Sequence, residues 1–496
     1  MVTISDRPLV DIAVNQKISG AYIDCHICFV CKRENMLTLV QTADLVRSGS
    51  LSAMRVVRDT LDRIERLNPA LNAFIRVDAE RAEREALEID RRVARSEDPG
   101  PLAGVPIGVK DMEPCAGFPM TEGSWFLRDS PPQAKDSRHV ARLRAAGAIV
   151  VGITATAEFG MDSATSTSLW GVTRNPWNTD RTPGGSSGGS SAAVAGGLVP
   201  LATGTDAGGS IREPASFTGI LGLKPSHGRI AKANGFSNWS VHGALVRTAA
   251  DAARHLDVAA GSHDGDRQSL PDLPYRYEDC IETLDVRRLR ACWSADYGFA
   301  AVDPEVVEIA HAAAIRLIAL AGLESTATRF SATNVYPHMG TLLASTLEAD
   351  FRRDGILPDG FDKLSPAMKR LLTRIGSRDV DTNRAWSEIR RLEQEVAAFF
   401  GQHDLLLSPA AACAPYGAAD PVPDVIDGRD ASLTGAEPFG MLANVCWNPA
   451  ISIPVGFTSD GLPVGLQIVG RRHRDDVLLR LARLWERAHP WPFVNN

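Results

Sequence analysis

PGGSSGGSSAAVAGG, residues 183–197, begins with the composition of a flexible linker and ends with that of a buried segment. The theme returns as GTDAGGSIRE at residues 204–213. Glycine accounts for nine of the 28 residues from Pro183 to Ser210, yet the intervening AAVAGGLVPLA is apolar and must be buried. Glycines beside a core allow close backbone approach or conformations that other residues avoid. This combination is typical of a site where main-chain N–H groups face a ligand.

Three kinds of ligand suit such a backbone: a phosphate, a dinucleotide, or the oxyanion formed in acyl transfer. A phosphate loop needs G-x-x-x-x-G-K-[ST], and a dinucleotide loop needs G-x-G-x-x-G after a strand. Neither pattern is present in the glycine-rich stretches. We therefore expect an oxyanion hole made of successive backbone N–H groups beside a nucleophilic serine.

GGSSG at residues 184–188 matches G-x-S-x-G, the nucleophile elbow of α/β-hydrolases, but that elbow must follow a strand. The preceding WGVTRNPWNTDRTP contains two prolines and several turn formers, so it is a poor strand. A Ser-His-Asp triad also needs a histidine, and the eleven histidines lie scattered without a partner motif. We expect the nearest downstream histidines, His227 and His242, to be structural or surface residues.

Composition excludes several classes of protein. The chain has 496 residues, 44% of them hydrophobic and 23% charged, as in ordinary globular proteins. A formal net charge of −7 supplies no basic field for nucleic acid. The sequence has no run of 18 apolar residues and no secretory signal, which predicts a cytoplasmic protein without a membrane partner. Eight cysteines in so long a chain are too sparse for a disulfide scaffold, so we expect thiols.

CHICFVC at residues 25–31 places Cys25, Cys28 and Cys31 at C-x2-C-x2-C spacing, with His26 between the first two cysteines. A cluster site of the ferredoxin type needs a fourth cysteine after three further residues, and the sequence reaches Gln41 without one. We favour the interpretation that residues 1–35 are a poorly ordered extension whose cysteines bind nothing, with a weak metal site as the alternative. Residues 36–496 are then expected to form a single domain with interior insertions, especially 265–290 and 325–440, which we expect to form a subsidiary lobe.

Helical and strand patterns alternate along that domain. Ser52 is a predicted N-cap for a helix that ends before Pro69, and further helices are expected over 78–96, 304–322, 338–352 and 380–401. Short apolar runs predict strands at 105–109, 149–153 and in DLLLSPA, and TSDG joins the runs AISIPVGF and LPVGLQIVG as a hairpin. The alternation predicts an α/β fold.

Four segments resemble the amidase signature family of serine hydrolases, in the same order and spacing from about Leu39 to Trp491. They are GVPIGVKD, WGVTRNPWNTDRTPGGSSGGSSAAVAGG, LATGTDAGGSIREPASFTGILGLKPSHGR and NPAISIPVGFTSDGLPVGLQIVG. The resemblance implies the amidase signature fold, in which helices cover both faces of a large mixed β-sheet. The chain departs from the family where Ile153, Thr154 and Ala155 replace a common Lys-Thr-Asn.

That family uses a Ser-cisSer-Lys triad. By resemblance Ser210 is the nucleophile, Lys110 is the base, and Ser186 bridges them after a cis peptide bond from Gly185. A lysine can act as a base near neutral pH only if burial lowers its pKa, which suits the end of an apolar strand. The resemblance further implies an oxyanion hole formed by Ala207, Gly208, Gly209 and Ser210. It also implies that these residues are supported by Ser187, Thr205, Asp206 and Arg212.

The function implied by the resemblance is hydrolysis of a carboxamide through an acyl-serine intermediate, without a metal or organic cofactor. The expected partner is then a small-molecule amide with an apolar or aryl acyl group. Esters and carbamates could enter the same cycle. The alternative is the A component of a tRNA-dependent amidotransferase, but NGFSNWSVHGALVRTAADAA at 234–253 lacks the usual SLDQ-like element. A scaffold that has lost its catalytic activity is a minor alternative, because all three triad positions are intact. The sequence leaves a homodimer open.

The substrate pocket is expected between residues 230 and 445, where several aromatic side chains could form its walls. The candidates are Phe236, Trp239, Tyr336, Phe439 and, just beyond that range, Trp447.

Overall fold

The structure is a computed structural model, and it describes residues 36–232, 238–376 and 381–494. Residues Leu37–Val494 form one compact unit. The expected N-terminal extension with Cys25, Cys28 and Cys31, and the pocket candidate Phe236, lie outside the described residues. The cysteines within the described ranges are free thiols, as expected.

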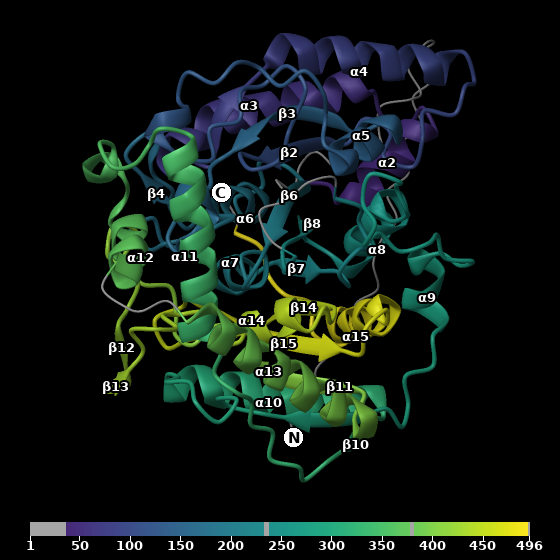
Figure 1. Cartoon of the computed structure of the whole chain (residues 1–496). Coiled ribbons are helices and arrows are strands. Elements are labelled where there is room, and N and C mark those ends of the chain that lie inside the picture. Colours follow the sequence, from purple (N-terminus) through teal and green to yellow (C-terminus); the bar gives the residue numbers. More distant parts are fainter. Residues whose placement is uncertain (1–35, 233–237, 377–380, 495–496) are drawn as a thin grey trace, which may run out of the picture. The chain divides into compact units, whose positions relative to one another are not determined.

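Eleven strands of the described chain form one mixed sheet (Figure 1). The neighbouring pairs β2/β3, β2/β6, β9/β10 and β9/β11 are parallel, and the others are antiparallel. The predicted hairpin is present as β14/β15. In sheet order the strands are β1 (Phe74–Val77), β3 (Ile149–Thr154), β2 (Pro106–Lys110), β6 (Leu201–Asp206), β8 (Val241–Val246), β7 (Leu221–Lys224), β14 (Ala450–Phe457), β15 (Pro463–Gly470), β11 (Leu405–Pro409), β9 (Arg290–Trp293) and β10 (Glu324–Ser325).

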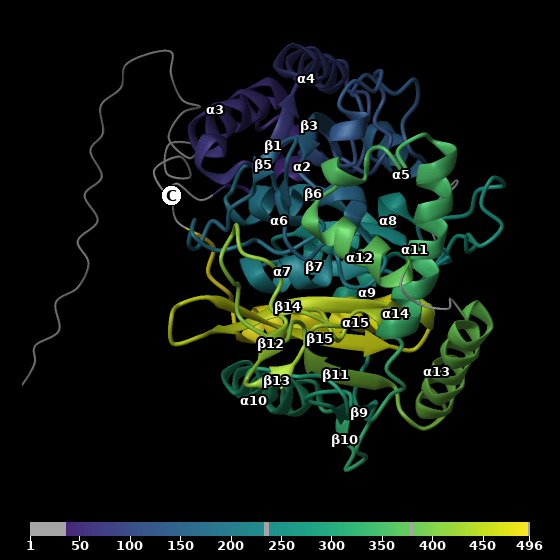
Figure 2. The same cartoon turned by 60° about the vertical axis from the view of Figure 1, so that its left-hand side comes forward.

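Helices cover both faces of this sheet, as the family resemblance implies (Figures 1 and 2). Alternate side chains of one strand point to opposite faces, so Leu405 and Leu407 of β11 belong to one hydrophobic cluster and Leu406 belongs to another. The first face packs against α2 (Leu39–Arg47), α5 (Arg138–Ala145), α8 (Ala249–Ala259), α9 (Tyr277–Thr283), α10 (Pro304–Ala321) and α15 (Asp475–Ala488). The second packs against α3 (Ala53–Leu71), α4 (Ala79–Ala94), α6 (Gly188–Ala195), α7 (Arg212–Thr218), α11 (Tyr336–Arg353), α13 (Thr382–Gln402) and α14 (Met441–Val445).

One predicted helix boundary is wrong. Helix α3 is capped by the Ser52 side chain as expected, but it continues through Pro69 to Leu71. Proline in the last turn removes only one backbone donor, and the left-handed residue Asn72 then ends the helix by donating its N–H to the carbonyl of Asn68.

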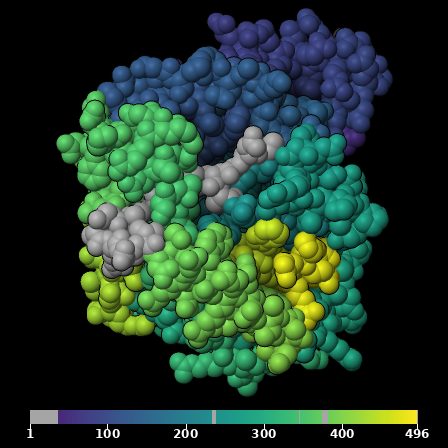
Figure 3. Space-filling model, in the orientation of Figure 1, coloured from purple at the N-terminus to yellow at the C-terminus, as the bar shows by residue number. Residues whose placement is uncertain are grey.

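Most of the expected subsidiary lobe belongs to the main body instead. Segment 265–290 contributes Tyr277 and Ile281 to the first-face core, and segment 325–440 contributes β11 to the sheet. Helices α11 and α12 (Pro366–Gly376) share a separate hydrophobic cluster, which includes Leu347 and Met368 and also Phe159 from another part of the chain. Figure 3 shows this region in green at the left of the face. Among the helices of the described ranges, none combines the length and apolar character needed to cross a membrane.

Candidate active site

Two neighbouring parallel strands carry the predicted site residues to one edge of the sheet. Strand β2 ends at Lys110 and strand β6 ends at Asp206, and the two strands pair through Ile107 and Leu201. Carboxyl ends of parallel strands in one sheet lie at the same edge, which is where α/β proteins bind ligands. Segments far apart in the sequence therefore meet at this edge.

Lys110 is fully buried, and its amine contacts three hydroxyl groups. Nζ lies 2.8 Å from Oγ of Ser186, 2.8 Å from Oγ of Ser187 and 2.9 Å from Oγ1 of Thr205. Burial lowers the pKa of Lys110 to about 7, although the carboxyl groups of Asp206, Glu437 and Glu113 act in the opposite direction. A substantial fraction of this amine is therefore neutral near pH 7.

Ser186 lies just before helix α6, after a cis peptide bond between Gly185 and Ser186. This is the bond that the family resemblance implies. A side chain at Gly185 would collide with the backbone carbonyl of Asp162, so the close approach of two chain segments requires glycine here. The linker-like composition of residues 183–189 thus reflects tight backbone packing.

The turn between β6 and α7 carries Ser210 and is held by Asp206. The Asp206 carboxylate accepts hydrogen bonds from the backbone N–H of Gly209 (2.8 Å) and of Ile211 (3.1 Å). It also accepts two hydrogen bonds from the Arg212 guanidinium, at 3.0 and 2.9 Å. Burial, the largest single influence, would raise the pKa of Asp206, but the charge and hydrogen bonds of Arg212, the charge of Lys224 and the N–H of Ile211 together outweigh it and lower the pKa to about 2. The pair is buried inside the protein, and the hydrogen bonds of Asp206 hold the backbone of the turn.

The predicted oxyanion hole differs from the structure at Gly209. Its N–H donates to Asp206, so it is not free to bind an oxyanion while this bond is present. The N–H groups of Ala207, Gly208 and Ser210 remain candidates. Ser210 has 9% of its surface exposed, and no described residue forms a hydrogen bond with its Oγ. The structure thus forms the Lys110–Ser186 link but no hydrogen bond from Ser186 to Ser210.

Two buried acidic residues near this turn were missed by the sequence analysis. The carboxyl group of Glu437 lies where a side chain at Gly209 would project, and Glu213 accepts a hydrogen bond from the Gly185 N–H at 3.3 Å. Burial, followed by electrostatic repulsion from Asp206 for Glu437 and from Glu437 for Glu213, raises the pKa of both well above the usual value. Glu437 follows no recognisable motif, so only the tertiary fold identifies it.

The aromatic pocket candidates have diverse surroundings. The Tyr336 hydroxyl donates to the backbone carbonyl of Glu437, close to the site. Phe439 and Trp239 belong to the hydrophobic core of the second face, and Phe439 is fully buried. The ring of Trp447 stacks on that of His227, with 4.2 Å between the ring centroids. His227 and His242 are both buried, so they are structural rather than surface residues.

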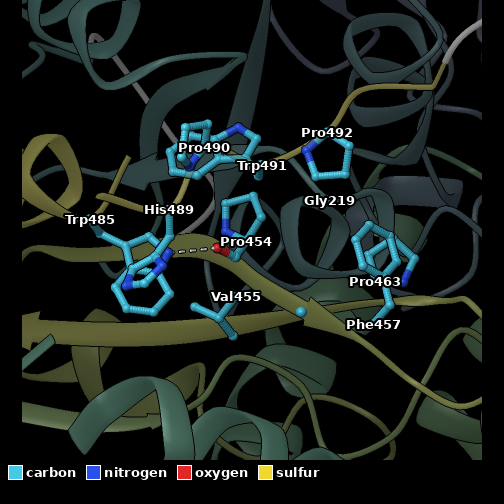
Figure 4. Close-up of a pocket in the computed structure, with 11 residues that line it drawn as sticks. Gly219, Pro454, Val455, Phe457, Pro463, Trp485, His489, Pro490, Trp491 and Pro492 are labelled. Carbon is cyan, nitrogen blue, oxygen red and sulfur yellow. Dashed lines mark hydrogen bonds between the residues drawn. The ribbon is translucent and has the colours of Figure 1, made fainter. Parts of the chain in front are cut away.

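A pocket beside the β14–β15 hairpin lies apart from these residues (Figure 4). It contains none of the predicted site residues and therefore is not the catalytic site. Its lining residues are Gly219, Pro454, Val455, Gly456, Phe457, Pro463, Trp485, His489, Pro490, Trp491 and Pro492.

Comparison with known proteins identifies the family. The Amidase family model matches residues 55–479. An acylamidase of Rhodococcus erythropolis is 35% identical over 471 residues, which cover 92% of this chain and 96% of the relative. The chain belongs to the amidase signature family. It is an amide-hydrolysing enzyme.

Two further proteins are similar to this amidase over most of its length. The A component of a glutamyl-tRNA(Gln) amidotransferase of Cyanothece sp. is 33% identical, with 90% of this amidase and 96% of the relative covered. The crystal structure of a bacterial aryl acylamidase of the same family superposes with a TM-score of 0.85 at 28% identity, covering 92% of this amidase and 97% of that chain. Membership thus agrees with the fold and with the four sequence segments.

Proposed function

We propose that this amidase hydrolyses linear amides of small apolar or aryl acids through a covalent intermediate on Ser210. Lys110 acts as the base, Ser186 relays the proton, and the N–H groups of Ala207, Gly208 and Ser210 stabilise the oxyanion. The observation that carries the proposal is the buried Lys110 amine, which lies 2.8 Å from the Ser186 hydroxyl. No other base is needed.

Acylation begins with neutral Lys110. Its lone pair accepts the Ser186 proton as Ser186 accepts the proton of Ser210, and the Ser210 oxygen then attacks the carbonyl carbon. The Ser186–Ser210 hydrogen bond that this step requires forms when substrate binds, since catalytic hydrogen bonds are often long or misaligned without substrate. Asp206 and Arg212 support the step by fixing the turn on which Ser210 lies.

Collapse of the tetrahedral intermediate breaks the C–N bond. The proton held by Lys110 returns through Ser186 to the departing nitrogen, which leaves as a neutral amine. Water then attacks the acyl ester by the same relay, which releases the acid and restores the Ser210 hydroxyl. Negative charge on the carbonyl oxygen is met in both halves by fixed N–H dipoles.

The substrate class rests on the relatives. Relatives described as an acylamidase and an aryl acylamidase favour an acyl amide over a free amino acid amide. A glutaminase activity coupled to a partner protein is the second candidate, because relatives at 33% identity are the A components of amidotransferases. Purified chain that releases ammonia from glutamine would support it.

The test compares wild type with Ser210→Ala and with Ser48→Ala, which changes an exposed serine at the C-terminal end of α2. Each is assayed against anilides, alkyl amides, hydrazides, carbamates, esters and glutamine. We expect anilide hydrolysis in wild type and Ser48→Ala and none in Ser210→Ala. A fluorophosphonate should label Ser210, as read by peptide mass spectrometry. Full activity of Ser210→Ala would overturn the proposed nucleophile.

A further inference from the structure

Three buried metal-ligating side chains converge beneath the strand edge that carries Lys110. Glu113 follows β2 by three residues, His139 lies in α5, and His242 lies in β8. The Glu113 and His139 side chains are fully buried, and that of His242 is 9% exposed. One ligand atom from each residue lies within 4.8 Å of the other two. None of the three is used in the proposed reaction.

Hydrogen bonds satisfy this cluster only in part. Oε1 of Glu113 accepts from the Ser137 hydroxyl (2.8 Å) and lies 3.0 Å from Nδ1 of His139. Nδ1 of His242 lies 3.4 Å from the same oxygen without forming a hydrogen bond. Oε2 of Glu113 and Nδ1 of His242 are buried and have no hydrogen-bond partner in the structure. Buried polar atoms in folded proteins nearly always have a bonding partner. We therefore expect a bound species to contact Oε2 of Glu113 and Nδ1 of His242.

The donor set is that of a transition-metal site. Two imidazole nitrogens and a carboxylate oxygen bind Zn²⁺ in several hydrolases, with the remaining position open to water. Oε1 of Glu113 lies 3.0 Å from Nδ1 of His139 and 3.4 Å from Nδ1 of His242, and separations of this size suit ligands that share one ion at metal–ligand distances of about 2.0–2.2 Å. Ligand atoms of all three residues lie within 4.8 Å of one another. A lone water molecule also could bridge polar atoms, but a carboxylate with two imidazoles supplies both the charge and the nitrogen ligands that a cation requires.

The surroundings of the cluster support metal binding. Metal-ligating histidines almost always donate their second ring nitrogen to a fixed acceptor. Nε2 of His139 lies 2.8 Å from Nε2 of His255 on α8, which can accept this proton when Nδ1 binds a metal. Ser137 similarly holds the Glu113 carboxylate. Both contacts orient ligands without taking a coordination position.

We propose that Glu113, His139 and His242 bind one transition-metal ion of the Zn²⁺ class, through a carboxylate oxygen and the two Nδ1 atoms. The ion cross-links the turn after β2, helix α5 and strand β8. The Glu113 N–H donates to the Lys110 carbonyl at 3.0 Å, and His242 pairs in register with Thr205, which contacts the Lys110 amine. The ion thus stabilises the strand ends around Lys110, and no step of hydrolysis runs through it.

The test uses the full chain carrying Cys25→Ser, Cys28→Ser and Cys31→Ser, because CHICFVC could bind metal by itself. After removal of metals with EDTA, Zn²⁺ alone is titrated calorimetrically. We expect one ion per chain, loss of binding in Glu113→Gln and His242→Gln, and binding weakened about 10- to 100-fold in His255→Phe. His311→Gln changes an exposed histidine on α10 and should bind as the triple variant does.

A second measurement does not depend on whether the cluster variants fold. Co²⁺ added to the triple cysteine variant should give the visible absorption of a four- or five-coordinate nitrogen and oxygen site, and its thermal midpoint should rise with Zn²⁺. Absence of Zn²⁺ uptake overturns the proposal. The proposal is also overturned if Glu113→Gln and His242→Gln fold and still take up as much Zn²⁺ as the triple cysteine variant. Because neither readout is hydrolysis, failure of the metal site is distinguishable from failure of the proposed function.

Discussion

The Lys110 amine and the Ser186 hydroxyl form a 2.8 Å hydrogen bond although the two residues are 76 positions apart in the chain. Both residues are buried, at 0% and 2% exposure. The contact joins the end of a central strand to the turn that precedes α6. A proton can therefore move between these groups without passing through solvent.

Removal of the Lys110 amine should abolish most of the activity. Lys110→Met keeps an unbranched apolar side chain in the buried space but has no basic amine, so we expect kcat/KM for a reactive anilide to fall by about 10²- to 10⁴-fold. Steady-state kinetics measure this, with Lys135→Met as the control for an exposed lysine. Activity within threefold of wild type in a folded Lys110→Met variant contradicts the assignment of the base.

The lowered pKa of Lys110 predicts a pH profile. The protonated amine cannot accept the Ser186 proton, so kcat/KM should rise with pH and level off above about 7, the pKa to which burial lowers this group. Below that value we expect about a tenfold decrease per pH unit. A profile that instead rises near pH 10, the usual lysine range, would show that the amine is solvated in the working enzyme.

Much of the fold follows from local sequence patterns. Apolar runs bounded by turn residues predicted β2, β3, β11, β14 and β15, because a buried strand needs apolar side chains on both faces. The predicted end of α3 before Pro69 is wrong, because proline usually marks a helix end but is tolerated in the last turn of this helix. Strands β6, β7 and β8 were not predicted, because LATGTD and VHGALV mix small and polar residues whose burial depends on their neighbours.

The proposed catalytic residues could be named because they lie within segments whose order and spacing resemble a known family. The contacts that these residues make could not be predicted from the sequence. The use of the Gly209 N–H by Asp206 depends on the geometry of one turn. The approach of Glu437 depends on the docking of a distant loop. The Glu113, His139 and His242 cluster joins three elements whose spacing in the sequence carries no metal-binding signature.

Disruption of the buried Asp206–Arg212 pair should lower both stability and activity. Asp206→Asn leaves the Arg212 guanidinium without its charge partner, and breaking a buried pair in this way costs about 3–5 kcal/mol. Urea denaturation at pH 7 measures the loss. Because folding lowers the pKa of Asp206 from 3.8 to about 2, the stabilisation should be fully present above about pH 4 and should decline as the pH falls toward 2.

The matched control for that experiment is the exposed pair of Arg55 and Asp59, whose closest atoms are 2.8 Å apart, compared with 2.9 Å for Asp206 and Arg212. Asp59→Asn should change the free energy of unfolding by no more than about 1 kcal/mol, because solvent screens the pair. Similar losses for Asp206→Asn and Asp59→Asn would mean that the buried pair does not fix the nucleophile turn.

Gly209 provides a separate test of the turn. Its φ of +134° and the carboxyl group of Glu437, which occupies the space of a side chain, both disfavour alanine. Gly209→Ala should therefore lose activity and stability, whereas Gly197→Ala, at a φ of +71° with no atom within 4 Å, should lose only about 1 kcal/mol through backbone strain. Adding Glu437→Ala removes the collision and should recover part of the thermal midpoint of Gly209→Ala. Equal midpoints for Gly209→Ala and Gly197→Ala would show that Glu437 does not restrict this turn.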